Sequence, residues 1–249
     1  LNSAARVVLV AQRGNLLDQL ERLTEPVTAL RLPPKSNVAS EAPRSPPAVP
    51  DLEFFNGLGG FADGGKQYVT VLGPGQSTPA PWINVISNPG FGFHVAADGG
   101  GYTWAVNSRE NQLTPWSNDP VTDRPGEALY IHDDDSGALW SPTAHPIRDE
   151  RATYMARHGW GFSRFEHVAH GIASTLSQFV PLDAPVKISR LTLHNTSSRT
   201  RHLSVTGYVE WVLGRARQSS LAFIATSIDP VTGAMLAANP VSYTHLRAH

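Results

Sequence analysis

The spacing of turn-forming residues constrains the fold of this chain more than any other feature. Between residues 52 and 240, short apolar runs are separated by clusters of Gly, Pro, Asn and Asp, and no long segment with helical periodicity lies between them. These clusters fall at 64–65, 73–75, 88–90, 99–101, 133–137, 195–198 and 229–233. Breakers at such intervals are typical of antiparallel sandwiches and barrels. The sequence therefore predicts an all-β fold, one large antiparallel β-sandwich over 52–240, and excludes doubly wound α/β folds.

The clearest strand pattern lies in residues 202–213. Apolar residues such as Val205 and Val209 alternate there with polar ones, and a period of two predicts a strand with one buried face. A polar turn at 195–200 separates this segment from 186–194. We therefore expect the two segments to pair as an antiparallel hairpin.

Two further pairings are expected in the second half of the chain. Residues 161–180 are interpreted as two strands that bend at His170-Gly171. Residues 221–228 and 233–238 are expected to form a hairpin across the turn-forming sequence Asp229-Pro230-Val231-Thr232-Gly233.

The residues before the sandwich have a different composition. Leucine spacing in 5–23 predicts one short amphipathic helix, which is too small to form a domain. We interpret residues 1–32 as the end of an upstream module and the proline-rich residues 33–51 as a semi-extended linker. Residues 241–249 continue no earlier pattern and resemble translated adapter sequence, so we expect a non-native tail there.

Charge and cysteine content exclude several classes of function. The formal net charge of the 249 residues is -1, which offers no broad attraction to nucleic acid or anionic lipid, so no nucleic-acid partner is expected. The chain contains no cysteine, which excludes disulfides and cysteine-based zinc sites and fits a reducing compartment. No apolar run approaches the roughly 18 residues of a membrane-spanning helix.

Three short motifs resemble cofactor sites, but their surroundings favour simpler interpretations. Gly57–Ala62 fits a dinucleotide fingerprint, yet Asp63-Gly64-Gly65 follows where a helix would have to begin, so we interpret it as a Gly-rich turn that enters the first strand. The two histidines of Glu166–His170 would point to opposite faces of a strand, which argues against a metal site. Asp133–Asp135 lacks the downstream Glu of a calcium loop and is interpreted as a solvated hairpin turn. No metal or other cofactor is therefore expected.

Tryptophans interleaved with polar, planar side chains mark the candidate site. Five of the six tryptophans fall between residues 82 and 165, among Asn, Asp, Gln and Arg residues. Aromatic rings cover the apolar faces of sugars, while amides and guanidinium groups bind hydroxyl edges, although tryptophan also fills sandwich cores. Polar loops on a rigid sheet are common binding elements. The candidate substrate-binding residues are Arg109, Asn111, Trp116, Arg157, His158 and Trp160.

Several long motifs occur in an order that resembles a known enzyme family. They are 54–61 (FFNGLGGF), 78–86 (TPAPWINVI), 101–104 (GYTW), 107–111 (NSREN), 113–116 (LTPW), 140–143 (WSPT), 157–162 (RHGWGF) and 179–182 (FVPL). Over about residues 52–240 the chain resembles the N-terminal β-sandwich of family-94 glycoside phosphorylases. Within that family it is similar in particular to the phosphorylase-like region of bacterial cyclic β-1,2-glucan synthases. The resemblance implies a galactose-mutarotase-like supersandwich.

The resemblance also implies how such a sandwich contributes to catalysis. In that family an (α/α)6 barrel follows the sandwich and carries the Asp general acid, while inorganic phosphate, as co-substrate, attacks the sugar from the opposite face. No catalytic residue is therefore expected in this chain. Its implied partners are a β-glucan oligosaccharide, the missing barrel of the same polypeptide and a second subunit in a homodimer. Its implied place is the cytoplasmic face of an inner-membrane parent, itself a glycosyltransferase with phosphorolysis-type control of chain length.

Two alternatives stay open. A stand-alone β-oligoglucan phosphorylase would not need the module end and linker ahead of residue 52. A non-catalytic carbohydrate-binding module would show glucan affinity in the isolated segment 52–240.

Overall fold

The computed structural model describes residues 48–117 and 125–241. Apart from residues 48–51 and 241, the expected upstream helix, linker and tail lie outside the described residues. The described segments form antiparallel sheets with one short α-helix, α2 (Arg217–Ser220), and one 3-10 turn, η2 (Leu221–Phe223), so the all-β prediction is confirmed. Neither helical segment is long or apolar enough to cross a bilayer.

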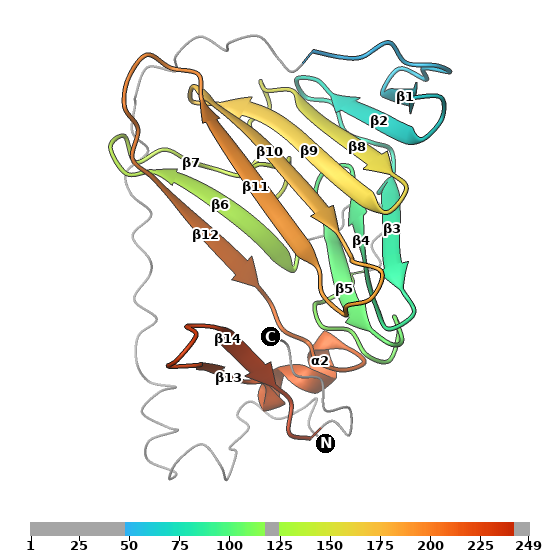
Figure 1. The fold of residues 1–249 in the computed structure, drawn as a ribbon, viewed down its shortest axis with the longest axis vertical. Helices are drawn as coiled ribbons and strands as arrows, with labels where there is room; N and C mark the ends of the chain where they lie inside the picture. The colour runs from blue at the N-terminus through green and yellow to red at the C-terminus, as the bar shows by residue number, and fades with distance from the viewer. Residues whose placement is uncertain (1–47, 118–124, 242–249) are drawn as a thin grey trace. The chain divides into compact units, whose positions relative to one another are not determined.

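The strands form four sheets (Figure 1). The largest sheet has six strands, in the order β1 (Gly59–Ala62), β2 (Gln67–Leu72), β8 (Tyr154–Gly159), β9 (Phe162–Ala169), β10 (Ile172–Phe179) and β11 (Ile188–Asn195). A three-stranded sheet contains β3 (Ile83–Asn88), β4 (Phe91–Ala96) and β5 (Gly101–Ala105). Another has the order β12 (Leu203–Val209), β6 (Glu127–Asp133) and β7 (Leu139–Trp140). A separate hairpin pairs β13 (Ala225–Ile228) with β14 (Met235–Ala238).

Both three-stranded sheets pack on one face of the six-stranded sheet. Phe93 of β4 shares an apolar cluster with Phe165 of β9 and Leu176 of β10. Ile131 of β6 shares another cluster with Ile172 of β10. Because Ile172 and Leu176 are four residues apart on one strand, they point to the same face. This arrangement is the two-layer packing of a sandwich.

The expected short-range pairings are confirmed. β9 and β10 pair across His170-Gly171, where the two residues have φ values of 51° and 75°. β13 and β14 pair across the 229–233 turn, although the start of the expected strand 221–228 is the 3-10 turn. Gly57 and Leu58 lead into β1, which is formed by the rest of the motif, Gly59–Ala62, so the segment is a Gly-rich entry into the first strand.

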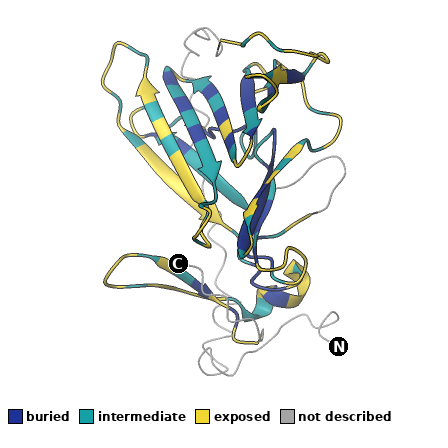
Figure 2. Cartoon of the chain, turned by 45° about the vertical axis from the view of Figure 1, so that its right-hand side comes forward, coloured by how far each residue is buried: buried dark blue, intermediate teal, exposed yellow. Residues whose placement is uncertain are grey.

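The expected hairpin between 186–194 and 202–213 is wrong. β11 pairs with β10, whereas β12 crosses to the other layer and pairs with β6, with Val205 opposite Ile131. The face predicted to be buried is also largely open, since Val205 is 48% and Val209 39% exposed. Exposed residues dominate both β11 and β12 (Figure 2). An alternating pattern specifies the two faces of a strand but not its partner, which here lies about 70 residues upstream.

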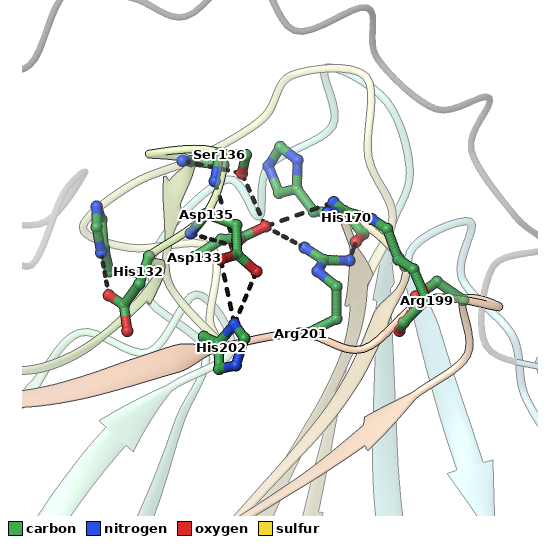
Figure 3. A network of polar contacts seen from close by, with 12 residues as sticks. His132, Asp133, Asp135, Ser136, His170, Arg199, Arg201 and His202 are labelled. Carbon is green, nitrogen blue, oxygen red and sulfur yellow. Dashed lines mark hydrogen bonds and ion pairs between the residues drawn. The ribbon is translucent and has the colours of Figure 1, made fainter.

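The interpretation of Asp133–Asp135 as a solvated turn is wrong for its first residue. The Asp133 side chain is fully buried at the end of β6, and Arg201 Nη2 lies 2.5 Å from its Oδ2. Ser136 Oγ donates to the same oxygen at 2.7 Å. Arg201 also donates to the His170 carbonyl, so the network ties β6 to the turn between β9 and β10 (Figure 3). The other two aspartates of the run are exposed, as expected.

A second ion pair lies at the start of β6. Lys187 Nζ is 2.7 Å from Glu127 Oε2, while the Thr103 and Thr114 hydroxyls donate to Oε1 at 2.5 and 2.8 Å. Burial by itself would raise the pKa of Glu127, but Lys187 and the two hydroxyls outweigh it and hold that pKa below its usual value. Glu127 is therefore ionised in the folded chain at neutral pH.

Replacing Lys187 by Met is expected to lower the free energy of unfolding at pH 7 by about 1–3 kcal/mol, because Glu127 loses its counterion. Burial then raises the Glu127 pKa above that of the unfolded chain. The folded variant therefore takes up a proton more readily, and it recovers part of its stability as the pH falls toward 5. Urea denaturation at the two pH values measures the effect. Lys66→Met, at an exposed lysine, is the control; equal midpoints for the two variants would contradict the role of the pair.

Candidate functional site

The six predicted substrate-binding residues fall into two groups. They are Arg109, Asn111 and Trp116 in the segment after β5, and Arg157, His158 and Trp160 at the end of β8. In the described residues, no hydrogen bond, ion pair or ring contact joins one group to the other. The structure therefore does not join the six residues in one contact network.

The first group lies on the 107–116 loop, which folds back on β5. The Arg109 guanidinium is 77% exposed, 3.7 Å from a Glu110 carboxylate oxygen. Trp116 is 41% exposed, and its ring stacks on Tyr102 with 5.3 Å between centroids and 14° between planes. The Asn111 backbone donates to Asn107 at 3.0 Å, which closes the loop. The loop thus carries an exposed guanidinium and a partly exposed aromatic ring, and a role for either in substrate binding stays a prediction.

Alternation along β8 separates Arg157 from His158, because neighbouring strand residues point to opposite faces. Arg157 Nε lies 3.0 Å from Glu166 Oε1 in a partly buried ion pair. His158 instead shares a face with Tyr68, its partner across β2 and β8. Trp160 lies in the turn after β8 and is 82% exposed. A role for Arg157 in substrate binding stays a prediction, and it would lie on a different face from His158.

A groove of about 520 Å³ opens beside Trp160. This volume is within the range of about 300–1,000 Å³ that is common for ligand pockets. We call it the aromatic groove; its aromatic and polar lining includes Asn56, Phe61, Gln67, Tyr68, Trp82, His158 and Trp160. The groove draws on β1, β2, β3, the end of β8 and the turn between β8 and β9.

Edge-to-face ring packing holds the wall of the aromatic groove. The Tyr68 ring lies 5.1 Å from Phe61 and 6.0 Å from Trp82 between centroids, with interplanar angles of 85° and 78°. Asn56 Nδ2 donates to the Tyr68 hydroxyl at 3.0 Å. The rings are therefore arranged before any ligand binds, which reduces the entropy lost on binding.

Polar contacts hold the turn that presents Trp160. Asn84 Nδ2 donates at 3.0 and 2.9 Å to carbonyls on the two sides of that turn, which ties β3 to β8 and β9. His158 Nδ1 lies 2.9 Å from Ser163 Oγ. Burial lowers the pKa of His158 to about 4, although the Trp82 backbone acts in the other direction. The imidazole is therefore neutral at physiological pH.

Sequence reasoning identified only part of this site. His158 and Trp160 were candidates, and Trp82 belonged to the group of possible sugar-binding rings. Tyr68 was missed, because its place in the groove depends on the register of β2 against β8, which sets it opposite His158. Asn56 was missed because only its side-chain contact with Tyr68 brings it to the groove.

The aromatic groove has the chemistry of binding and not of bond cleavage. It combines rings, amides and a neutral imidazole, and Lys66 is its one charged side chain among the described residues. Glycosidic cleavage requires a carboxylic acid at the leaving oxygen, and no carboxylate in the described segments lines this groove. Sugars, whose rings have apolar faces and hydroxyl edges, are ligands that suit such a surface. The fold is that of a β-sandwich module, and its groove offers rings and amides of the kind that contact sugars.

The sequence profile described as "Glycosyl hydrolase 94, supersandwich domain" matches residues 66–248. The chain belongs to this family, and the resemblance inferred from its motifs is confirmed.

Three relatives show how far the similarity extends. The chain is 41% identical over 251 residues to the cyclic beta-(1,2)-glucan synthase NdvB of Rhizobium meliloti (strain 1021), covering 97% of this chain and 9% of that protein. It is 32% identical over 155 residues to an N,N'-diacetylchitobiose phosphorylase of Vibrio furnissii, covering 61% of this chain and 19% of the relative. It is 31% identical over 166 residues to a solabiose phosphorylase of Paenibacillus borealis, covering 66% and 21%. The chain thus spans about a tenth of the synthase and about a fifth of the phosphorylases.

Proposed function

We propose that this chain is the supersandwich module of a larger enzyme that builds or phosphorolyses β-linked glucans, in the manner of a cyclic β-1,2-glucan synthase. The observation that carries the proposal is the 41% identity to such a synthase across 97% of the chain. The weaker similarity to two phosphorylases supports a phosphorolytic step in the same polypeptide.

The chemistry of this proposal lies outside the module. In inverting phosphorolysis, phosphate attacks the anomeric carbon while a carboxylic acid protonates the departing glycosidic oxygen from the other side. We place that acid on an (α/α)6 barrel of the same polypeptide.

The role of the module is to support the barrel and to form one wall of the glucan cleft. Exposed apolar side chains on β12, at Val205, Tyr208 and Val209, offer a surface for packing against further protein. Arg109 and Trp116 are the side chains proposed to meet glucan in the cleft, with Asn111 beside them. A second copy as partner and a position at the cytoplasmic face of the inner membrane remain part of the proposal, and both rest on the family resemblance of the motifs alone.

The isolated chain is expected to release no glycosyl phosphate from β-1,2-gluco-oligosaccharides and inorganic phosphate, whereas the complete polypeptide does so. In the complete polypeptide, Trp116→Ala is expected to lower kcat/KM about tenfold or more, because an aromatic contact with the glucan is lost. Leu182→Ala, at a side chain that is 91% exposed, is the control. Turnover by the isolated chain would contradict the proposal, as would an unchanged kcat/KM for the folded Trp116→Ala variant.

A further inference from the structure

We propose that the aromatic groove is a second glucan site, which binds neutral β-linked gluco-oligosaccharides on this module without the catalytic domain. The class of ligand rests on the proposed function; the site itself rests on the geometry that follows. It is separate from the 107–116 loop, which we assign to the catalytic cleft.

Trp160 provides the main apolar contact. Its side chain is 82% exposed, an unusual state for the largest aromatic residue. It lies in a tight turn in which Gly161 has a φ of 79°, a conformation that glycine adopts without strain. Asn84 fixes this turn by its two hydrogen bonds to the turn carbonyls. The backbone of Trp160 is thus held at a defined place, and its exposed ring is open to an apolar sugar face.

The groove wall provides a second ring and the polar contacts. Trp82 packs edge-on against Tyr68 at 6.0 Å between centroids and lines the same groove as Trp160. Gln67 adds an amide group that can donate to and accept from hydroxyls. The Asn56 oxygen already accepts from two backbone N–H groups and its nitrogen donates to Tyr68, so Asn56 can add only its second N–H. Rings that are fixed, together with amides at their edges, match a ligand with alternating apolar faces and hydroxyl edges.

Charge in the groove favours a neutral ligand. His158 has its pKa lowered to about 4 by burial, so it carries no charge at neutral pH. Lys66 alone contributes charge to the described lining, and it is exposed. One solvated ammonium does not form an anion site, because phosphate recognition relies on several converging donors. A neutral glucan therefore fits better than a phosphorylated sugar or a nucleic acid.

A site apart from the cleft would serve a long glucan. If one stretch of the polymer lies in the aromatic groove, the remainder is held at a raised effective concentration near the catalytic domain. This role needs only modest affinity, and it is separate from the chemistry.

Isothermal titration calorimetry of the intact chain with β-1,2-gluco-oligosaccharides tests the proposal. We expect saturable binding that Trp160→Ala weakens about tenfold or more. Leu182→Ala, at a residue that is 91% exposed and does not line the groove, is the control and is expected to bind within about twofold of the unchanged chain. Since Trp160 is 82% exposed, its variant should retain the near-UV circular dichroism of the other tryptophans. Lowering the pH from 7 to 5.5 should leave binding unchanged, because His158 stays neutral over that range.

Three results would overturn the inference: no heat at millimolar oligosaccharide, equal binding by the chain and its folded Trp160→Ala variant, or loss of binding confined to Trp116→Ala. None of these results contradicts the proposed function, because the proposed function is tested by turnover of the complete polypeptide. If the isolated chain fails to bind while the complete polypeptide turns over and depends on Trp116, the second site is wrong and the proposed function stands.

Discussion

Replacing Asp133 by Asn is expected to lower the free energy of unfolding by about 3–5 kcal/mol, because it leaves the guanidinium of Arg201 buried without a counterion. The two side chains are 0% and 2% exposed, so water cannot take the place of the lost carboxylate. The amide oxygen of Asn can still accept from Ser136, which at present donates at 2.7 Å. The substitution therefore removes the charge while keeping the shape. Urea denaturation followed by circular dichroism measures the loss.

The pH dependence of this difference provides an independent check. Burial acts to raise the pKa of Asp133, but Ser136 and Arg201 outweigh it and bring the pKa from 3.8 to about 2. A pKa lowered by folding stabilises the folded state above pH 3.8, and this stabilisation is lost as the pH falls toward 2. The difference in the free energy of unfolding between the unchanged chain and Asp133→Asn should therefore become smaller as the pH falls from 3.8 toward 2. Asp134→Asn, at the exposed neighbour, should unfold close to the unchanged chain; equal midpoints for both variants would show that Asp133 is not paired as described.

Phe93→Ala is expected to cost about 3–5 kcal/mol, since it removes a fully buried ring from the junction of the two layers. Phe93 shares its cluster with Phe165 and Leu176 of the facing sheet. Lys187 Nζ also lies 4.4 Å from its ring centroid, so a cation–π contact is lost as well. The midpoint of urea denaturation should fall, with little change in the slope of the free energy of unfolding against urea concentration.

Phe54→Ala is the matched control for Phe93→Ala. Phe54 is 85% exposed, so its loss should change the free energy of unfolding by about 0.5 kcal/mol or less. Similar losses for the two phenylalanines would mean that the three-stranded and six-stranded sheets do not pack through Phe93.

The pairings that sequence analysis predicted correctly are those joined by short turns. His170-Gly171 and the 229–233 turn each connect strands that are adjacent in sequence, so local pattern and turn chemistry specify the pairing. The pairing of β12 with β6 depends on residues about 70 positions apart. Alternation in 202–213 is compatible with any partner, and no local signal favours β6 over β11.

Burial of charge was the hardest feature to predict. Asp133 lies in a run of three aspartates that looks solvated, and its partner Arg201 lies 68 positions away. A run of aspartates is compatible with an exposed turn or with a buried ion pair. Only the fold, which brings Arg201 to Asp133, decides between the two. Tryptophan allowed two interpretations, contact with sugar or filling of the core. Trp140 is 4% exposed and fills the core.

The candidate site was predictable where a motif carried the signal. Trp160 was a candidate within the motif 157–162, and the structure leaves it 82% exposed. Arg157 and His158 of the same motif were both candidates, but strand alternation places them on opposite faces, and Arg157 pairs with Glu166. The groove residue Tyr68 comes from another strand, so only the sheet register could reveal it.

The central claim is that the sandwich itself holds glucan in the aromatic groove while the bond-making chemistry lies elsewhere. Titrating the ¹⁵N-labelled chain with a β-1,2-gluco-oligosaccharide, and following the indole N–H resonances by NMR, tests this most directly. We predict that the Trp160 and Trp82 resonances shift together and saturate, while that of the core residue Trp140 stays in place. Shifts confined to Trp116, or no shift of any indole at millimolar ligand, would contradict the account.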